Sequence, residues 1–395
     1  MDSPQLQIAV DVGSTRHRVA VATADGQLLS EFDMQHDAVG FGHFFDCIEA
    51  HQRRTGASVV VAMEGYNGWA RPLDREVLAR GWKLFNVNNL KLARFKEIFP
   101  GPAKSDSIDA RKILELMQLA GSLRLAKAAL QSVAPVAAAN DKLKRFTRRR
   151  RVLVEERSRV LARLYADLQA VSPGLLEITG KIENRWFLNL LTCREDLRKL
   201  ASLRSAGMLA IRGVGKVYAA KIRAWQKNAR FSSEAEWVSP MIQADARRVL
   251  ALQQDIEALN ELISRESTDS QIATRIDSIP GFGCTCSAEL AGEIGTLDRF
   301  ATEASLALYL GMAVLDEHSG KQQGVRRARN VNVRAKAAMM VAVARHIEQV
   351  PASRRYYEKK RAEGKTHNQA VRALGRHLVR VIWSMIRNDR DYQLR

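Results

Sequence analysis

The sequence predicts an α/β domain followed by a mostly helical remainder. Between residues 7 and 87 short apolar segments alternate with helical segments, a pattern typical of helices packed on a largely buried sheet. From about residue 138 the apolar residues recur at helical spacing instead. We therefore expect an α/β domain over 1–130, a helical, coiled-coil-like domain over 131–268 and a mostly helical domain over 269–395.

Composition indicates a globular protein with a polyanionic partner. The chain has 395 residues, 46% of them hydrophobic, and a net charge of +19, which is enough apolar material for more than one core. No stretch of 18 apolar residues suggests a membrane span, and the N-terminus lacks the pattern of a signal peptide. Cysteines at 47, 193, 284 and 286 have no disulfide or zinc-finger spacing. We expect a cytoplasmic protein.

The charge is unevenly placed along the chain. Residues 1–130 hold 16 basic and 15 acidic residues, whereas residues 315–395 hold 19 and 7. Residues 141–165 hold 10 basic and 3 acidic residues, including Arg148, Arg149, Arg150 and Arg151. This run predicts a nucleic-acid-binding surface, and the alternative is a solvated helix face.

The elements of the first domain follow from local patterns. Strands are expected over 7–12, 18–22, 28–34, 58–63 and 82–87, with a hairpin turn at Asp25-Gly26. Helices are expected over 40–55 and 71–81, and a third should begin near Ser105 after a Pro-Gly-Pro break.

The helical domain contains two long amphipathic segments. An apolar stripe runs from Leu143 to Leu168, although Arg150 and Arg157 interrupt a strict heptad, and a second stripe covers 244–266. We expect these helices to pair antiparallel and to enclose the segment between them.

Two Gly-x-Gly turns precede helical segments rich in small residues. The first has Gly213, Gly215 and Lys216, within a segment over about 205–230, and the second has Gly281 and Gly283. Both match a helix-hairpin-helix pattern, in which backbone N–H groups face a phosphate. A helix–helix turn without a ligand explains the same residues.

Four acids form a candidate metal site. Asp11 and Glu64 end apolar strands, and Asp106 and Asp109 share one face of the helix that follows. Clustered carboxylates need a divalent cation or raised pKa values, and oxygen ligands suit Mg²⁺ or Mn²⁺. Asp109 alone also fits an ordinary first-turn acid. Residues 11–15 also match the phosphate loop of the actin and sugar-kinase superfamily, but no convincing second loop of that kind follows.

The motifs resemble a known family. Val10–Thr15, Met63-Glu64-Gly65 and Lys104–Arg111 are similar to blocks of the DEDD transposases of the insertion-sequence one-ten family. Further matching blocks are Ile279–Gly283, Glu293-Ile294-Gly295, Arg299-Phe300, Tyr309–Met312 and Ser319-Gly320. These proteins are bridge-RNA-guided serine recombinases related to the pilin-gene DNA invertases.

The resemblance implies a RuvC-like (RNase H-like) fold for the first domain, with Mg²⁺ held by the four acids. It also implies that Ser319 attacks a DNA phosphodiester, although by itself Ser319-Gly320 is only a polar turn. Nearby cations could hold phosphates, namely Lys321, Arg326, Arg327 and Arg329.

By resemblance we expect a bacterial transposase that is associated with the nucleoid. Its expected partners are donor and target DNA and a structured guide RNA. We also expect the chain to assemble into a dimer or a tetramer. The alternative is a RuvC-type metal-dependent Holliday-junction nuclease without a covalent intermediate. A third reading is a nucleic-acid-binding protein without activity.

Overall fold

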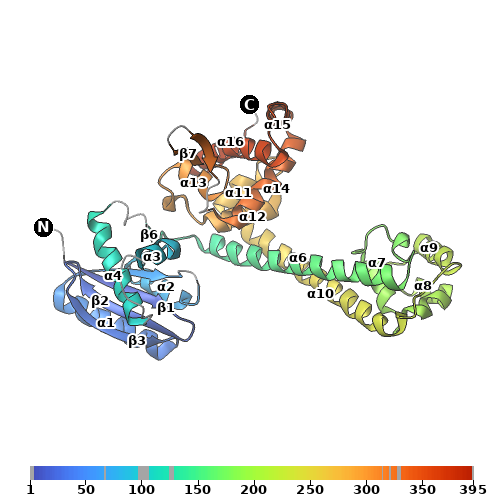
Figure 1. The fold of residues 1–395 in the computed structure, drawn as a ribbon, viewed down its shortest axis with the longest axis horizontal. Helices are drawn as coiled ribbons and strands as arrows, with labels where there is room; N and C mark the ends of the chain where they lie inside the picture. Colours follow the sequence, from blue (N-terminus) through green and yellow to red (C-terminus); the bar gives the residue numbers. More distant parts are fainter. Residues whose placement is uncertain are drawn as a thin grey trace. The chain divides into compact units, whose positions relative to one another are not determined.

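The computed structural model describes residues 4–65, 68–96, 106–123, 129–313, 315–319, 322–326 and 331–393. Its contacts divide the chain into two compact units, Met1–Pro135 and Val136–Arg395 (Figure 1). Each unit has its own hydrophobic cores. The domain boundaries after residues 130 and 268 remain predictions.

The first unit is built on a six-stranded mixed sheet with the order β3-β2-β1-β4-β5-β6. The strands are β1 (Gln5–Val12), β2 (Arg16–Thr23), β3 (Leu28–Gln35), β4 (Ser58–Glu64), β5 (Lys83–Val87) and β6 (Leu130–Ser132). β1 pairs antiparallel with β2 and parallel with β4. The predicted α/β class is thus confirmed, while the short edge strand β6 lacked a usable sequence signal.

Helices cover both faces of this sheet. α1 (Ala38–Thr55) and α2 (Arg71–Ala79) pack on one face, where Ile8, Val10 and Val61 point. α3 (Asn89–Lys96) and α4 (Asp106–Ser122) pack on the other, where Ala9 and Ala62 point. The small side chains on the second face let α4 approach β1 and β2 closely. The sequence did not predict α3.

The second unit contains a two-helix arm formed by α6 (Ala138–Val171) and α10 (Ala235–Thr268), which run side by side (Figure 1). Ion pairs join Lys142 to Glu266 and Arg163 to Asp245, so the helices are antiparallel, as predicted. α10 begins before the predicted residue 244, in spite of Pro240. That proline lies inside the helix, in its second turn, where it removes one backbone hydrogen bond.

The arm ends in a small helical cluster with its own core of apolar residues between Leu153 and Ile256. Its elements are η1 (Leu176–Ile178), α7 (Arg185–Thr192), η2 (Leu197–Ser202), α8 (Ser205–Leu209) and α9 (Lys216–Gln226).

The rest of the second unit is a helical domain around a separate core of residues such as Phe282, Met339 and Ile382. It comprises α11 (Gln271–Asp277), α12 (Gly283–Ile294), η3 (Leu297–Arg299), α13 (Glu303–Tyr309), β7 (Leu315–Ser319), β8 (Gln322–Arg326), α14 (Val333–Gln349), α15 (Pro351–Ala362) and α16 (His367–Arg387). None of the helices in the described part of the chain has the length and apolarity that a bilayer crossing requires.

Candidate functional site

The strand register brings Asp11 and Glu64 together. In the parallel pair β1–β4, Val10 lies opposite Met63, so the next residues along the two strands are Asp11 and Glu64. Adjacent strands lie about 4.8 Å apart. Side chains alternate along a strand, and Ala9 and Ala62 point to the α4 face. Asp11 and Glu64 therefore share that face, at the carboxyl ends of neighbouring strands.

The direction of α4 places its first turn at the same edge of the sheet. Gln118, late in α4, lies against Gly26 in the β2–β3 turn, beside the start of β1. Arg111, early in α4, donates to both carboxylate oxygens of Glu31 at 2.5 and 2.8 Å. α4 thus runs antiparallel to β1, so Asp106 and Asp109 belong to the end of the helix nearest Asp11.

An ion-pair network holds α4 in this position. Glu31 accepts from Arg111 and also lies 3.5 Å from Arg18. Hydrogen bonds from Arg111 and the charge of Arg18 lower the pKa of Glu31, although burial opposes them. Glu31 therefore stays ionised, and the helix is fixed on the sheet by charge as well as by its apolar face.

The donor set fits a hard divalent cation, because Asp11, Glu64 and Asp109 offer only carboxylate oxygens. Among the described side chains, no group of three or more His, Cys, Asp or Glu residues is close enough to hold a metal. The side chain of Asp106 lies outside the described ones. The structure thus groups the backbone positions of the four acids, and their role as ligands stays a prediction.

The predicted nucleophile lies on a β-hairpin rather than on an isolated turn. Ser319 ends β7, and its backbone pairs with Gln322 at the start of β8. Arg326 ends β8, whereas Lys321, Arg327 and Arg329 lie outside the described residues. The side chains of both strands also lie outside them.

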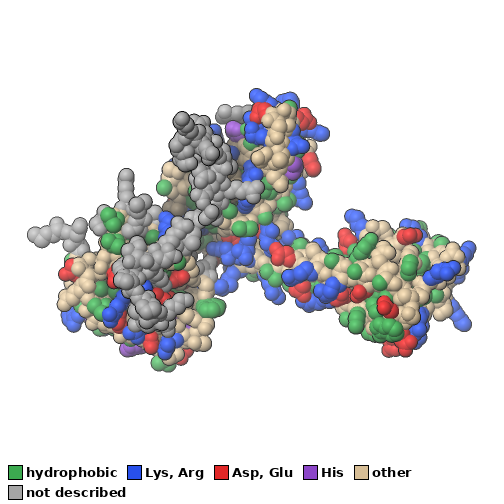
Figure 2. Space-filling view, viewed as in Figure 1, with side chains coloured by type: hydrophobic (Ala, Val, Ile, Leu, Met, Phe, Trp, Pro, Cys, Tyr) green, Lys and Arg blue, Asp and Glu red, His purple; other side chains and the backbone are tan. Residues whose placement is uncertain are grey.

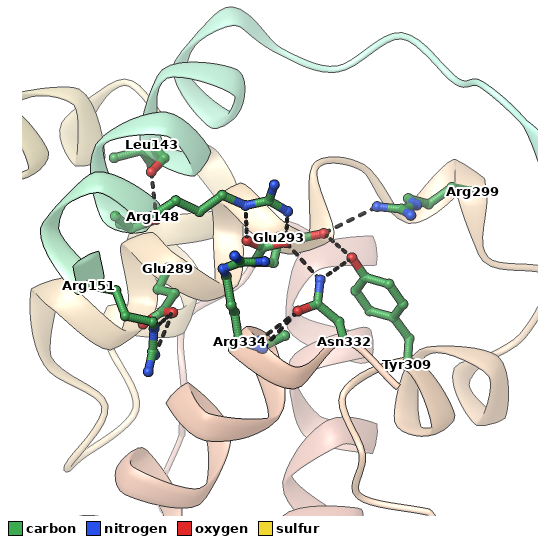
Figure 3. A network of polar contacts seen from close by, with 11 residues as sticks. Leu143, Arg148, Arg151, Glu289, Glu293, Arg299, Tyr309, Asn332 and Arg334 are labelled. Carbon is green, nitrogen blue, oxygen red and sulfur yellow. Dashed lines mark hydrogen bonds and ion pairs between the residues drawn. The ribbon is translucent and has the colours of Figure 1, made fainter. Parts of the chain in front are cut away.

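A buried polar network lies beside the segment that follows this hairpin (Figure 3). Its centre is Glu293 of α12, which is 0% exposed. Arg148 of α6 donates Nε to Glu293 Oε1 at 2.6 Å and Nη2 to Oε2 at 2.8 Å. Asn332 donates Nδ2 to Oε2 of the same carboxylate at 2.7 Å. A residue on the arm and one just after the hairpin thus share a carboxylate.

Two further side chains close the network. Asn332 also donates Nδ2 to Tyr309 Oη at 2.6 Å, and Tyr309 donates its hydroxyl to the Glu293 backbone oxygen at 2.9 Å. Arg299 donates Nη1 to the same backbone oxygen at 3.2 Å. Asn332 Oδ1 accepts from the first backbone N–H groups of α14, so Asn332 also caps that helix.

The network keeps Glu293 charged in a buried place. Burial raises the pKa of Glu293, but hydrogen bonds from Arg148 and Asn332 lower it by more than burial raises it. The pKa of Glu293 therefore lies below its ordinary value. Sequence reasoning noted Glu293, Arg299 and Tyr309 in matching blocks but missed their mutual contacts and Asn332. A usable signal was the spacing of Glu289 and Glu293, which share one face of a largely apolar helix.

This arrangement changes the interpretation of the arginine run in α6. Arg148 pairs with Glu293, and Arg151 pairs with Glu289 at 2.6 Å. Arg150 donates to Asn260 of α10 at 2.6 Å, whereas Arg149 is exposed. Three of the four guanidinium groups therefore have a structural role, because they join α6 to α12 and α10. Their predicted contact with nucleic acid is untested.

The two glycine turns also have packing roles. Gly213 and Gly281 have positive φ, and a Cβ on Gly281 would lie 2.4 Å from the backbone nitrogen of His346. Gly281 thus permits close contact with α14. By contrast, Gly215 and Gly283 have open space where a side chain would be, and Lys216 begins α9. The second glycine of each turn is the one that leaves its backbone accessible.

Positive charge extends over the second unit. Figure 2 shows Lys and Arg side chains along the arm and over α15 and α16. The last turn of α15 contains Lys359, Lys360 and Arg361. Lys360 pairs with Glu363 at 2.9 Å.

Comparisons with known proteins agree with these features. One family model, described as a transposase and named for the DEDD residues of IS110 elements, matches residues 8–173. A second, described as the transposase IS116/IS110/IS902 family, matches residues 273–358. The chain is similar to the IS900 uncharacterized 42 kDa protein of Mycobacterium paratuberculosis, with 27% identity over 97% of this chain and 96% of the relative. It is also 26% identical to the IS110 uncharacterized 43.6 kDa protein of Streptomyces coelicolor, over 98% and 95% of the two chains. Two family models in the expected order and full-length relatives show that the chain belongs to the IS110 family of insertion-element transposases.

Proposed function

We propose that this transposase cuts and rejoins DNA through Ser319, together with a divalent cation held by Asp11, Glu64, Asp106 and Asp109 in a RuvC-like domain. The observation that carries the metal half of the proposal is the register of β1 and β4. It puts Asp11 and Glu64 side by side on the face that α4 covers.

The cation, Mg²⁺ or Mn²⁺, would supply Lewis-acid stabilisation of phosphate oxygens. The protein's own contribution is to hold the carboxylates at one edge of a rigid sheet, where Arg111 and Glu31 fix the helix that carries two of them.

In the proposed covalent step, the Ser319 hydroxyl attacks a DNA phosphorus atom. One P–O bond to serine forms while one P–O bond to a deoxyribose oxygen breaks, and the serine proton passes to that leaving oxygen or to a nearby base. The phosphoserine ester conserves the bond for rejoining to a second DNA strand. The position of Ser319 at a strand end, with Asn332 anchored after the hairpin, supports a constrained nucleophile.

A covalent-trapping assay tests this mechanism. Wild-type protein and Ser319→Ala are incubated with end-labelled element-end DNA and Mg²⁺, then separated under denaturing conditions. We expect a labelled protein band for the wild type and none for Ser319→Ala. Glu64→Gln should reduce strand exchange by at least about 100-fold.

The same assay distinguishes the RuvC-type nuclease. A water nucleophile would give cleavage without any labelled protein and equal activity for Ser319→Ala, which would refute the serine mechanism. Equal activity of Glu64→Gln, or of wild type in a chelator, would refute the metal site.

We further propose that a structured guide RNA and a second copy of the chain complete the active assembly. The excess positive charge of the second unit supports binding of more nucleic acid than a single DNA site provides. RNA that remains bound through high-salt purification, and a dimeric or larger mass in solution, are the expected results. A monomer free of RNA that recombines DNA would contradict both.

A further inference from the structure

The start of α10 carries an apolar stripe that is exposed to solvent and has no role in the mechanism above. Trp237 and Met241 are 57% and 59% exposed, and Pro240 and Ala244 are exposed as well. This spacing places the four residues on one side of the helix. Figure 2 shows hydrophobic side chains gathered on the lower side of the arm, toward its far end. Contiguous exposed apolar surface of this kind marks an interaction site.

A different face of the same turns belongs to the core. Ile242, Ala246 and Val249 are 0% exposed and pack in the core at the end of the arm. α10 is therefore apolar on two faces, and the residues that the structure describes bury only one of them. A second apolar face is typical of a helix that packs against a further element. Because Trp237 and Met241 are large, covering them would remove considerable apolar area from water.

Opposite charges flank the stripe. Glu234 and Glu236 precede it, and Arg247 and Arg248 follow it. All four residues are exposed. The stripe thus has a negative end and a positive end. A surface with this order of charges is complementary to itself when a second copy lies on it in the opposite direction.

The contacts that these groups already make leave charge available for a partner. Arg247 donates Nη2 to the neutral side chain of Gln243 at 3.0 Å, so this bond does not neutralise the guanidinium. The Glu236 side chain is 72% exposed, and it lies 3.8 Å from Arg198, near the limit for an ion pair. Arg248 is already paired with a carboxylate of α6. Glu236 and Arg247 are therefore the charges that a second copy would engage.

We propose that this stripe binds the same stripe of a second copy of the chain, with the two α10 helices antiparallel. The two-fold axis passes between Pro240 and Met241. In this register Trp237 lies against Ala244 of the partner subunit, so a large side chain meets a small one. Glu236 lies beside Arg247 of the partner subunit, and the two-fold axis repeats each contact. The inference rests on the proposed function only in its need for a second copy, for which it names the contact surface.

Other occupants fit the stripe less well. Nucleic acid would be repelled by Glu234 and Glu236 at one end, whereas a purely basic surface would attract it. A parallel second copy would place Glu236 beside Glu236 and Arg247 beside Arg247, which is unfavourable because like charges meet. An antiparallel copy satisfies both the apolar stripe and its charged ends.

Sedimentation of the full-length protein over a range of concentrations tests the proposal, after nuclease treatment and a salt wash have removed nucleic acid. Met241→Asp places two carboxylates at the two-fold axis. Val217→Asp is the matched control, because Val217 is an apolar residue of α9 that is 70% exposed and lies outside the stripe. Glu236→Arg and Arg247→Glu each bring like charges together, and the double variant restores opposite charges in reversed order.

We expect the wild type to dimerise, and Met241→Asp to raise the dimer dissociation constant by at least about 100-fold, because an unpaired carboxylate is costly to bury. Each single charge reversal should raise it by about tenfold, and the double variant should lie within about threefold of the wild type. Val217→Asp should change it by less than about twofold. If Met241→Asp unfolds early in a thermal scan, the charge rescue decides the outcome, since a folding defect cannot produce rescue.

Each contrary result has a distinct meaning. A dimer that Met241→Asp and both charge reversals leave intact would overturn this interface, while the proposed second copy would stand. A double variant that is as weak as the single ones would overturn the antiparallel register. Met241→Asp that weakens DNA binding without changing sedimentation would make the stripe a nucleic-acid contact instead. A wild type that stays monomeric at every concentration would overturn both the interface and the second copy, whereas the covalent adduct at Ser319 would still test the DNA chemistry separately.

Discussion

The ion pair between Arg148 and Glu293 should contribute strongly to the stability of the second unit. The change is Arg148→Met, which keeps much of the side-chain volume and removes the charge. Glu293 is 0% exposed, so it would be left as a buried carboxylate. Breaking a buried pair from one side costs about 3–5 kcal/mol. Because the Arg148 side chain is 38% exposed, we expect the lower end, about 3 kcal/mol.

Hydrogen exchange of the α12 amides in the full chain measures this loss directly. A loss of about 3 kcal/mol corresponds to roughly 100-fold faster exchange. Arg163→Met is the matched control on the same helix. Arg163 also pairs with a carboxylate, that of Asp245, but its side chain is 59% exposed. Exposed pairs contribute little to stability, so exchange near Arg163 should rise by less than about fivefold.

The pH dependence separates a charge effect from simple loss of packing. In the wild type the pKa of Glu293 is lowered, so its contribution is complete above the unfolded pKa and is lost as pH falls through the folded one. Without Arg148, burial dominates and raises the pKa. The penalty of Arg148→Met should then be largest at neutral pH and shrink toward pH 5, as Glu293 takes up a proton. A penalty that is constant from pH 7 to 5, or below about 1 kcal/mol, would refute this reasoning.

Two further predictions concern backbone geometry and a buried histidine. Gly281→Ala should cost about 3 kcal/mol in urea unfolding, since its Cβ would lie 2.4 Å from the His346 nitrogen and φ is +88°. Gly283→Ala should cost only about 1 kcal/mol, because its φ of +60° is also left-handed but the space around it is open. Equal costs would show that the contact with α14 is not what selects glycine. Burial and the charge of His36 lower the pKa of His17 to about 4 from 6.5, so stability should be complete above pH 6.5 and fall by about 3 kcal/mol as pH approaches 4. Thermal unfolding between pH 7 and 4 checks this, and His17→Asn should have a flatter profile.

Elements with a strong local pattern could be predicted from the sequence. The three antiparallel strands, the buried strand that ends at Glu64 and the pairing of two long amphipathic helices all follow from period and turn chemistry. The edge strand Leu130–Ser132 could not, because three residues, two of them exposed, carry no signal of their own. The strands of the Ser319 hairpin contain many polar and charged residues, so they read as a loop.

Long-range partners were beyond sequence reasoning. The arginines at 148 and 151 look like a solvent-facing basic patch, because their acidic partners lie about 140 residues further along the chain. A run of arginines is typical of a surface that binds a polyanion. In this chain Arg148 and Arg151 instead pair with two carboxylates of the protein's own helix α12. The positions of Asp11 and Glu64 could be predicted from the sequence because both residues end strands. The contact of Asn332 could not, because it depends on tertiary packing.

Arg148 and Asn332 both donate to the Glu293 carboxylate, so the arm is joined to the segment that follows the Ser319 hairpin. From Arg148 to Val171 the helix α6 extends for about 35 Å at 1.5 Å per residue. A tilt of about 5° about the Arg148 end would thus move the far end by about 3 Å. Since Asn332 caps the helix directly behind the hairpin of Ser319, a load on the distal cluster would act on the anchor of the predicted nucleophile.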